Sequence, residues 1–339
     1  MGAATVGLVT RSVLVTGGAG FIGSHLCEAL HAKGFAVTAF DDLSTGALSN
    51  LASLRSAAGF RFVEGSVLDR SMINGLVSEA DYVVHLAAAV GVQLVLAKPL
   101  DSFLVNIDGT HSVLEAVERH DRRLIVASTS EVYGKNTDVP LGETSDRILG
   151  PLEVTRWWYS ISKGVDEILA LGYHHERGVA ATVARFFNTV GPRQVGRYGM
   201  VIPRFVGQAQ RGEPLTVYGT GQQTRTFCHV LDTVSALELL LEEDRAVGQA
   251  FNIGGMEETT IEELALQVLD VTQSSSSMTF VPYEDAYPAG FEDTERRVPD
   301  TSKLAALVGW KPQHTLRTIL KDVAFDLEAN QLPMTTDLN

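Results

Sequence analysis

The stretch Val13-Leu-Val-Thr-Gly-Gly-Ala-Gly-Phe-Ile-Gly23 decides the fold of this chain. A short apolar run leads into Gly17, Gly20 and Gly23, and a helical pattern starts at once over residues 24–32. Gly17 permits a sharp turn, Gly20 lets the backbone approach a pyrophosphate, and Gly23 lets the helix pack close to the sheet. The free N–H groups at the start of such a helix face the phosphate charge. The pattern therefore predicts the first strand, turn and helix of a dinucleotide-binding βαβ unit.

The second predicted strand, residues 36–40, ends in Asp41 and Asp42. This position is close to the offset of roughly 20 residues at which a carboxylate binds the adenosine ribose in dinucleotide-binding folds. A carboxylate at Asp41 would accept hydrogen bonds from the ribose hydroxyls and would repel a 2′-phosphate. No arginine follows within several residues. The sequence therefore favours NAD over NADP as the cofactor.

The composition limits the class of protein. The 339 residues are 45% hydrophobic and 20% charged, which is ordinary for a globular enzyme with one large domain and a smaller one. The net charge of −14 argues against a nucleic-acid partner but not against a small anionic ligand. Cys27 and Cys228 provide neither a disulfide framework nor a paired metal-ligand spacing, and no metal site is expected. Without a secretory signal or an apolar run long enough to span a bilayer, a cytoplasmic enzyme without a membrane partner is expected.

Short β-rich runs alternate with helical patterns, which is typical of a parallel sheet with helices on both faces. We expect an α/β protein, with a Rossmann-type doubly wound parallel sheet and a smaller C-terminal α/β substrate-binding lobe. Further strands are predicted at 60–64, 82–86, 123–127, 179–187, 215–218 and 250–253, and helices at 102–120, 157–176 and 232–243. The NAD-binding domain is expected to span residues 1–187, completed by about 229–256. Residues 188–228 and 257–339 are expected to form the substrate lobe.

Residues with catalytic chemistry follow the fifth strand. The segment Ser128-Thr-Ser-Glu-Val-Tyr-Gly134 places hydroxyls and a carboxylate at the carboxyl edge of the sheet, where ligands of such folds bind. Tyr159 and Lys163 lie four residues apart on the next helix, on the same face. An ammonium group beside a phenol, together with the positive nicotinamide ring, is expected to lower the pKa of the phenol. Tyr159 would then act as a general base on a substrate hydroxyl while hydride leaves its carbon.

With these motifs the chain resembles the extended short-chain dehydrogenase/reductase superfamily, in its nucleotide-sugar epimerase, dehydratase and decarboxylase branch. The resemblance runs from Thr16-Gly-Gly-Ala-Gly-Phe-Ile-Gly23 to Arg297-Val-Pro-Asp300. It implies a tightly bound NAD that is regenerated in each turnover, and a second lobe that binds a nucleotide sugar. It also implies a homodimer, formed in relatives by the helices at 102–120 and 157–176.

The resemblance also assigns roles to individual residues. The residues implied to bind the cofactor are Gly17, Gly20, Phe21, Ile22, Gly23, Asp41, Asp42, Ser44, Thr45, Gly46, Ser66, Val67, Leu86, Ala87, Ala88, Asn106, Tyr159 and Lys163. The catalytic candidates are Tyr159, Lys163, Thr129, Ser130 and Glu131. The substrate-binding candidates are Arg156, Asn188, Arg193, Val201, Arg204, Thr216, Tyr218, Arg225 and Arg297. Arg225 and Arg297 are implied to hold the diphosphate, because a guanidinium fork bonds two phosphate oxygens at once.

Members of this branch first oxidise the sugar at C4, and they differ in what happens to the 4-keto intermediate. Ser130 stands where 4,6-dehydratases carry an aspartate, which disfavours dehydration because a serine hydroxyl is a poor general acid. Thr129-Ser130-Glu131 with Arg156 and Arg225 resembles UDP-glucuronate decarboxylases. Gly191-Pro-Arg-Gln194 is nearer to 4-epimerases, including those that act on UDP-glucuronate.

We therefore expect 4-epimerisation of a UDP-sugar, namely UDP-glucuronate to UDP-galacturonate, in the manner of a UDP-glucuronate 4-epimerase. The alternatives are decarboxylation of UDP-glucuronate, to UDP-xylose or a 4-keto-pentose, and 4-epimerisation of UDP-glucose. Thr129, Ser130 and Arg156 are the candidates for holding the uronate carboxylate, and Glu131 is either an acid/base or a structural carboxylate. A non-enzymatic NAD-binding regulator is disfavoured because the Tyr159 and Lys163 pair is intact.

Overall fold

A computed structural model describes residues 11–90, 98–196, 200–286, 292 and 294–329 of the chain. Its centre is a seven-stranded parallel sheet with the strand order β11-β6-β5-β4-β1-β2-β3. The strands are β1 (Ser12–Thr16), β2 (Ala36–Asp41), β3 (Phe60–Glu64), β4 (Tyr82–His85), β5 (Arg123–Thr129), β6 (Ala181–Phe187) and β11 (Ala250–Gly254). The chain moves outward from β1 in both directions, which confirms the predicted doubly wound α/β fold.

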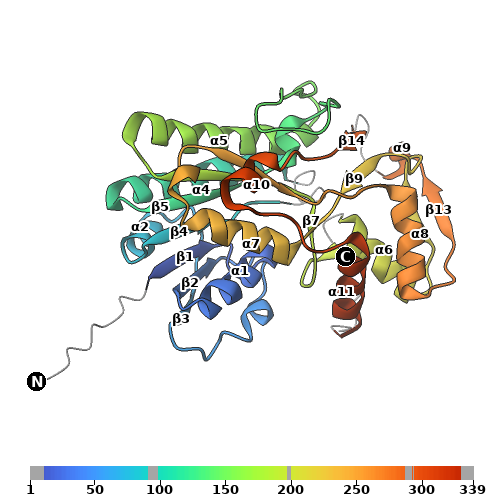
Figure 1. Cartoon of the computed structure of the whole chain (residues 1–339), viewed down its shortest axis with the longest axis horizontal. Helices are drawn as coiled ribbons and strands as arrows, with labels where there is room; N and C mark the ends of the chain where they lie inside the picture. Colours follow the sequence, from blue (N-terminus) through green and yellow to red (C-terminus); the bar gives the residue numbers. More distant parts are fainter. Residues whose placement is uncertain (1–10, 91–97, 197–199, 287–291, 293, 330–339) are drawn as a thin grey trace, which may run out of the picture.

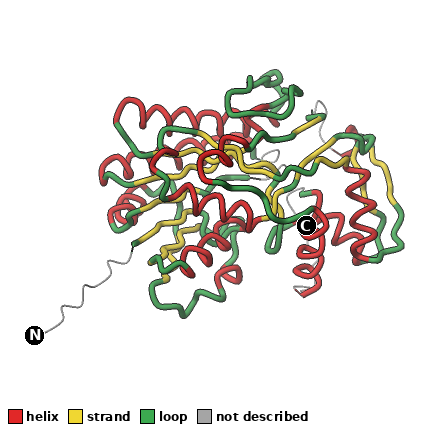
Figure 2. The backbone as a smooth tube through the Cα atoms, viewed as in Figure 1, coloured by secondary structure: helices red, strands yellow, loops and turns green. Residues whose placement is uncertain are grey.

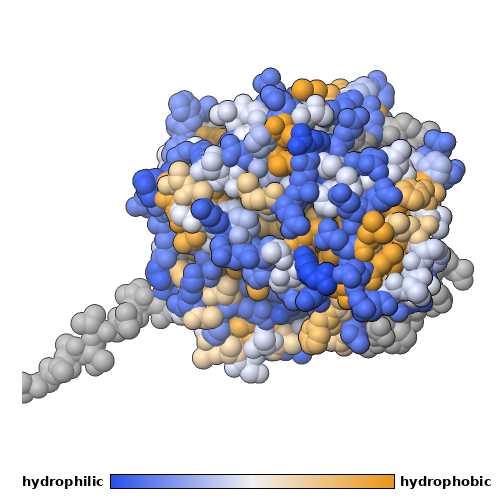
Figure 3. Space-filling model, turned by 45° about the vertical axis from the view of Figure 1, so that its right-hand side comes forward, coloured by the Kyte–Doolittle hydropathy of each residue, from blue (hydrophilic) through white to orange (hydrophobic). Residues whose placement is uncertain are grey.

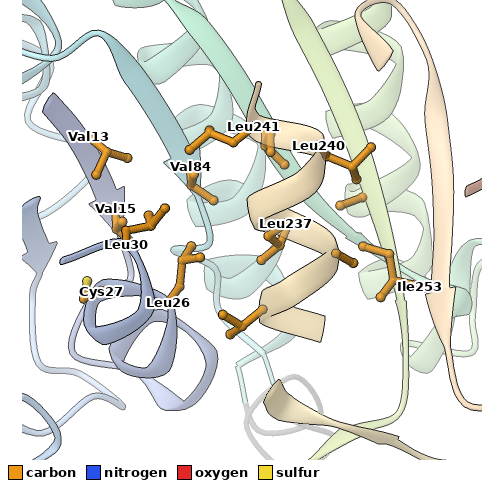
Figure 4. Packing of buried hydrophobic residues seen from close by; sticks show 14 of the residues in the cluster. Val13, Val15, Leu26, Cys27, Leu30, Val84, Leu237, Leu240, Leu241 and Ile253 are labelled. Carbon is orange, nitrogen blue, oxygen red and sulfur yellow. The ribbon is translucent and has the colours of Figure 1, made fainter. Parts of the chain in front are cut away.

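Helices cover both faces of this sheet (Figure 1). One face carries α1 (Phe21–Ala32) and α7 (Val230–Leu241), and the other carries α2 (Arg70–Ser78), α4 (Pro99–His120) and α5 (Arg156–Arg177). Side chains alternate along β1, so Val13 and Val15 pack on the face covered by α1 and α7, and Leu14 packs on the opposite face. We call the hydrophobic clusters on these two faces the first core and the second core. Figure 4 shows Leu26 of α1 and Leu237 of α7 in the first core, on the same side of the sheet as the two valines.

The second lobe is built around a core of its own. The elements there are α6 (Val201–Gln210), β8 (Leu215–Tyr218), α8 (Ile261–Thr272), β13 (Met278–Val281), α9 (Tyr283–Ala286) and α11 (Leu316–Ala329). α6, α8 and α11 pack together with β8 through a cluster that includes Phe205, Leu264 and Ile319. A three-stranded sheet, β12 (Glu258–Thr260), β9 (Thr224–Thr226) and β14 (Arg296–Arg297), lies between this lobe and the large sheet (Figures 1 and 2).

Short elements complete the part of the chain that the structure describes. The 3₁₀ turns are η1 (Leu48–Leu51), η2 (Ser130–Tyr133) and η4 (Asp244–Ala246); β7 (Thr189–Val190) pairs with β10 (Cys228–His229), and α10 (Ser302–Val308) lies against β11. Leu304 and Trp310 belong to the core of the large sheet. The whole range 257–339 was expected to belong to the substrate lobe. Instead, the chain returns to the first domain after β14, and it leaves that domain again before α11.

Several predicted ends differ from the observed ones. α1 begins at Phe21 rather than at 24, because Gly20 is its N-cap residue. β6 begins at Ala181 rather than at 179, and α7 spans 230–241 rather than 232–243. α2 was not predicted from the sequence. The face of the molecule shown in Figure 3 is mostly hydrophilic, with smaller apolar patches between the polar areas. Among the described residues, no helix has the length and apolar character needed to cross a bilayer.

Candidate active site

The glycine turn after β1 has the shape required for an anion. Gly17 has a φ of +70°, and a Cβ there would lie 2.8 Å from the Ala87 nitrogen. A Cβ at Gly23 would collide with the Gly17 carbonyl oxygen. Gly20 caps α1 without a side-chain hydrogen bond, and no acidic residue occupies the first turn of the helix. The N–H groups at this helix start therefore suit a pyrophosphate, as the sequence predicts.

Asp41, at the end of β2, is bound to this turn. Its Oδ2 accepts a hydrogen bond from the Ala19 nitrogen at 3.0 Å, and its Oδ1 accepts one from the Leu43 nitrogen at 2.8 Å. Burial raises the pKa of Asp41, although these backbone donors oppose the rise. Gly46 is close to both Asp41 and Ala19, and Asp42 accepts a hydrogen bond from the Ser44 nitrogen at 3.0 Å.

Other predicted cofactor residues surround the same turn. The Leu86 and Ala87 nitrogens donate to the Thr16 carbonyl oxygen and hydroxyl at 3.1 and 3.3 Å. Asn106 of α4 accepts a hydrogen bond from the Ala89 nitrogen at 2.8 Å and donates to the Ser162 hydroxyl at 3.1 Å. The remaining predicted cofactor residues lie nearby: Phe21 and Ile22 against the first core, Ser44 and Thr45 exposed after β2, Ser66 and Val67 after β3, and Ala88 after β4. The predicted cofactor roles of individual residues stay predictions.

Tyr159 lies in the first turn of α5, next to the end of β5. Thr129, the last residue of β5, hydrogen-bonds the Tyr159 side chain. The Thr129 hydroxyl also accepts a hydrogen bond from the Glu131 nitrogen at 3.2 Å, and the Ser160 hydroxyl donates to the Glu131 carbonyl oxygen at 2.6 Å. These bonds fix η2 against the start of α5. The predicted hydroxyl cluster and the phenol therefore meet at the carboxyl edge of the sheet.

The expected effect of Lys163 on Tyr159 is not observed in the chain alone. Burial raises the pKa of Tyr159 well above its ordinary value, and the carboxylates of Glu131 and Asp166 raise it further. Lys163 Nζ donates instead to Asp166 Oδ2 at 2.7 Å. The prediction of a pKa lowered by Lys163 is thus wrong for the protein without cofactor, because the lysine charge is balanced by a carboxylate that the sequence analysis did not include.

Glu131 is surrounded by positive charge. Its carboxylate accepts a hydrogen bond from Arg297 Nη1 at 2.8 Å and lies 3.4 Å from Arg156 Nη2. Burial raises the pKa of Glu131, but Arg156, Arg297 and Arg225 outweigh burial and lower the pKa to about 2. Without a bound anion, Glu131 is therefore ionised at neutral pH and is not set up as a proton donor. Ser130, which is buried, lies 3.4 Å from Arg297.

Arg225 and Arg297 are brought together by the small sheet. They are register partners in the parallel pair β9 and β14, so their side chains leave the same face. Both arginines are buried. Asn188 donates to the carbonyl oxygen of Thr226, the neighbour of Arg225, at 2.8 Å. The structure thus gathers four of the predicted substrate residues, Arg156, Asn188, Arg225 and Arg297, around the end of β5.

Four of the other predicted substrate residues form a second group, apart from the one around the end of β5. Arg204 stacks on the Tyr218 ring, with its guanidinium carbon 4.0 Å from the ring centre, and donates to the Thr216 carbonyl oxygen at 3.1 Å. Val201 begins the helix that carries Arg204. Arg193 does not join either group, because its guanidinium bonds both oxygens of Glu28 in α1 at 2.8 and 3.0 Å.

Sequence reasoning missed three buried polar residues near the site. Asp166 holds Lys163, and Glu167 binds Arg185 of β6 through two bonds of 2.8 Å. His85 at the end of β4 is bonded by threonines on both ring nitrogens. The position of Asp166 three residues after Lys163 was the one signal in the sequence, because residues at that spacing are neighbours on a helix. Within the described ranges, no group of histidine, cysteine, aspartate or glutamate side chains has the geometry of a metal site.

Comparison with known proteins gives consistent results. Residues 14–323 match the sequence family described as GDP-mannose 4,6 dehydratase. The chain is 40% identical over 313 residues to a UDP-N-acetyl-alpha-D-glucosaminuronate decarboxylase of Bacillus cytotoxicus, covering 92% of this chain and 96% of that protein. It is 36% identical over 321 residues to UDP-glucuronic acid decarboxylase 1 of Arabidopsis thaliana, covering 95% of this chain and 71% of that protein.

Solved structures with the same architecture include the UDP-glucuronic acid 4-epimerase of Bacillus cereus in complex with UDP-glucuronic acid and NAD. The TM-score is 0.85 at 28% identity, and the match covers 94% of this chain and 99% of that one. This similarity extends over both the large sheet and the second lobe.

Proposed function

Because the chain belongs to the extended short-chain dehydrogenase/reductase family of nucleotide-sugar epimerases, dehydratases and decarboxylases, we propose that it is an NAD-dependent decarboxylase of a UDP-linked uronate. The two relatives described above are both named as decarboxylases of uronates, one of them N-acetylated. These names support decarboxylation, the alternative raised by the Thr129-Ser130-Glu131 motif, better than the 4-epimerisation expected from the sequence.

The observation that carries the proposal is the charge balance around Glu131. Three guanidinium groups, those of Arg156, Arg225 and Arg297, act on one carboxylate that is already ionised. Such a largely buried group of guanidinium side chains suits an anionic ligand, because each guanidinium can bond two oxygens of a phosphate or carboxylate at once. A UDP-uronate brings both a diphosphate and a carboxylate. Arg225 and Arg297, side by side on β9 and β14, suit the diphosphate, and Arg156 on the Tyr159 helix suits the uronate.

Each residue of the site has a definite task in this reaction. Bound NAD supplies reversible hydride transfer at C4 of the sugar. Tyr159, with its hydroxyl oriented by Thr129, exchanges a proton with the 4-hydroxyl oxygen. The positive nicotinamide ring is the added charge that would offset the raised pKa of Tyr159. Glu131, fixed as an anion, orients Arg156 and Arg297 rather than donating a proton.

Loss of CO₂ follows from the chemistry of the substrate. A 4-keto uronate is a β-keto acid, which releases CO₂ readily once the carboxylate is aligned for cleavage. A hydrogen replaces the carboxylate on C5, so the overall reaction takes up one proton and releases one CO₂. The protein must therefore hold the carboxylate in the cleaving alignment, and Arg156, Thr129 and Ser130 are the residues that we assign to this task.

A second candidate is 4-epimerisation of UDP-glucuronate. It is favoured by the match over both lobes to the Bacillus cereus 4-epimerase that binds UDP-glucuronic acid. An epimerase would hold the same carboxylate out of the cleaving alignment. The two reactions share the oxidation at C4 and differ only in the fate of the 4-keto intermediate.

The test is to mix the purified protein with UDP-glucuronate, UDP-N-acetylglucosaminuronate or UDP-glucose and to monitor the products by proton NMR. We expect a UDP-pentose, or its N-acetylated form, together with CO₂. Formation of UDP-galacturonate would support the second candidate, and turnover of UDP-glucose alone would contradict both. The control is Tyr159→Phe, which should lose several orders of magnitude in turnover while NAD stays bound.

A further inference from the structure

Lys163 and Asp166 form an ion pair inside α5 that the proposed function does not explain. The Nζ and Oδ2 atoms are 2.7 Å apart, and the two side chains are 4% and 0% exposed. Among the described residues, Asp166 is the acceptor that holds Lys163 Nζ. Burying two charged groups costs a considerable free energy of desolvation, even when the two groups are paired.

The Asp166 carboxylate is also linked, through Thr110 and His85, to Thr16 at the start of the glycine turn. Thr110 of α4 hydrogen-bonds Asp166, and its hydroxyl lies 3.2 Å from His85 Nε2. His85 Nδ1 lies 2.7 Å from the hydroxyl of Thr16, the last residue of β1. Burial and Lys163 lower the pKa of His85 to about 3, so its ring is neutral. One consistent assignment has Thr16 donating to His85, His85 to Thr110 and Thr110 to Asp166, which ties Asp166 to the cofactor turn.

We propose that Asp166 is a positioning residue whose carboxylate competes with Tyr159 for the Lys163 ammonium and thereby sets the pH range in which proton transfer at Tyr159 operates. The proposal rests on the proposed function, because it concerns the same base. Lys163 lies one helical turn from Tyr159 and is bonded to Asp166, whose carboxylate acts on the Tyr159 phenol, so the phenolate and the carboxylate share the field of one buried cation. While Asp166 holds the lysine charge, ionisation of the phenol adds an uncompensated anion to the site.

The other charged groups around this pair are already balanced or neutral. Glu131 is bound by Arg156 and Arg297, and Glu167 is bound by Arg185 of β6 and by Arg147. His85, from β4, is neutral. Burial raises the pKa of Asp166, and Lys163 and Thr110 oppose the rise. The Asp166 carboxylate is therefore the group whose removal leaves Lys163 without a counter-ion, and the Tyr159 phenolate is the group that can replace it.

The experiment measures ionisation of Tyr159 directly. The ultraviolet absorbance of phenolate is recorded against pH in the NAD-loaded protein, and the same titration of Tyr159→Phe is subtracted. In Asp166→Asn the midpoint of the Tyr159 titration should fall by about one pH unit or more, which corresponds to the removal of one nearby negative charge. Because no sugar substrate is needed, the result does not depend on whether the proposed reaction is correct.

Two further variants decide between a positioning and a structural role. Asp166→Ser removes the charge with a smaller side chain and should give the same fall, whereas Glu118→Gln, which breaks a surface ion pair with Arg177, should leave the midpoint unchanged. Asp166→Glu restores the charge and should move the midpoint back toward that of the natural protein. An unchanged midpoint in both neutral variants, or loss of the fold in both, would assign Asp166 a structural role and overturn the proposal.

Discussion

Glu131 and Glu167 both lie among arginines, yet their two clusters differ in how completely the charges are satisfied. Glu167 is 1% exposed and receives two bonds of 2.8 Å from Arg185, with further contacts from Arg147 and the Ser128 hydroxyl. Glu131 is 19% exposed, has one bond of 2.8 Å from Arg297, and stands 3.4 Å from Arg156. We call the first cluster closed, because its carboxylate is fully buried and multiply bonded, and the second open, because its carboxylate is partly exposed and less completely bonded.

The difference separates a structural cluster from a binding one. Arg185 also donates to the Tyr133 hydroxyl at 2.8 Å, and this hydroxyl donates to Asn252 Oδ1 at 2.7 Å. The closed cluster thereby joins β5, β6, β11 and α5, whereas the open cluster joins η2 and α5 to the small sheet of the second lobe. A fully bonded, buried carboxylate holds the fold together, whereas several guanidinium groups around a partly exposed carboxylate suit an incoming anion.

The largest effect should follow from breaking the closed cluster. Arg185→Ala leaves Glu167 buried beside a single remaining arginine, and it should cost about 3–5 kcal/mol of the free energy of unfolding. Urea unfolding monitored by circular dichroism measures this loss. The matched change in the open cluster is Arg297→Ala, which should cost clearly less stability. An equal loss of unfolding free energy in the two variants would contradict the assignment of a structural role to the closed cluster alone.

An intermediate effect should follow from changes in the open cluster, measured as affinity for UDP by calorimetry. Arg297→Ala should weaken UDP binding about tenfold or more, the equivalent of one lost charge-assisted hydrogen bond. Glu131→Gln should bind UDP more tightly, by several-fold, because it frees Arg156 and Arg297 from their counter-ion. Weaker UDP binding by Glu131→Gln in a folded protein would show that the carboxylate is needed to shape the diphosphate site.

The smallest effect should be the dependence of stability on acid pH. The folded-state pKa of Glu131 is about 2, and that of Glu167 is also lowered, whereas an unfolded glutamate titrates near its ordinary value of about 4.5. The stabilisation is thus fully present above that ordinary value and is lost as the pH falls toward the folded-state pKa. Between pH 7 and pH 5 these two groups should change Tm by less than about 2 °C. Below pH 4, the Tm of a Glu167→Gln variant should fall less steeply with decreasing pH than the Tm of the natural protein.

The sequence by itself determined the elements whose signal is local. Gly17, Gly20 and Gly23 specify the turn because backbone freedom and close packing are properties of those positions, whatever the rest of the chain does. Alternation along β1 likewise specifies which side chains enter which core. The spacing of Tyr159 and Lys163 placed both on one helix, and the position of η2 directly after β5 placed hydroxyls beside them.

Only the tertiary structure decided how the charges are distributed. Lys163 is bonded to Asp166 rather than to Tyr159, Arg193 is bonded to Glu28 of α1, and Arg297 reaches Glu131 from a strand far along the chain. The pKa of Tyr159 rises because burial and two carboxylates act on it through space. Electrostatic effects depend on distance and on exclusion of water, and neither quantity is encoded in the spacing of residues along a helix.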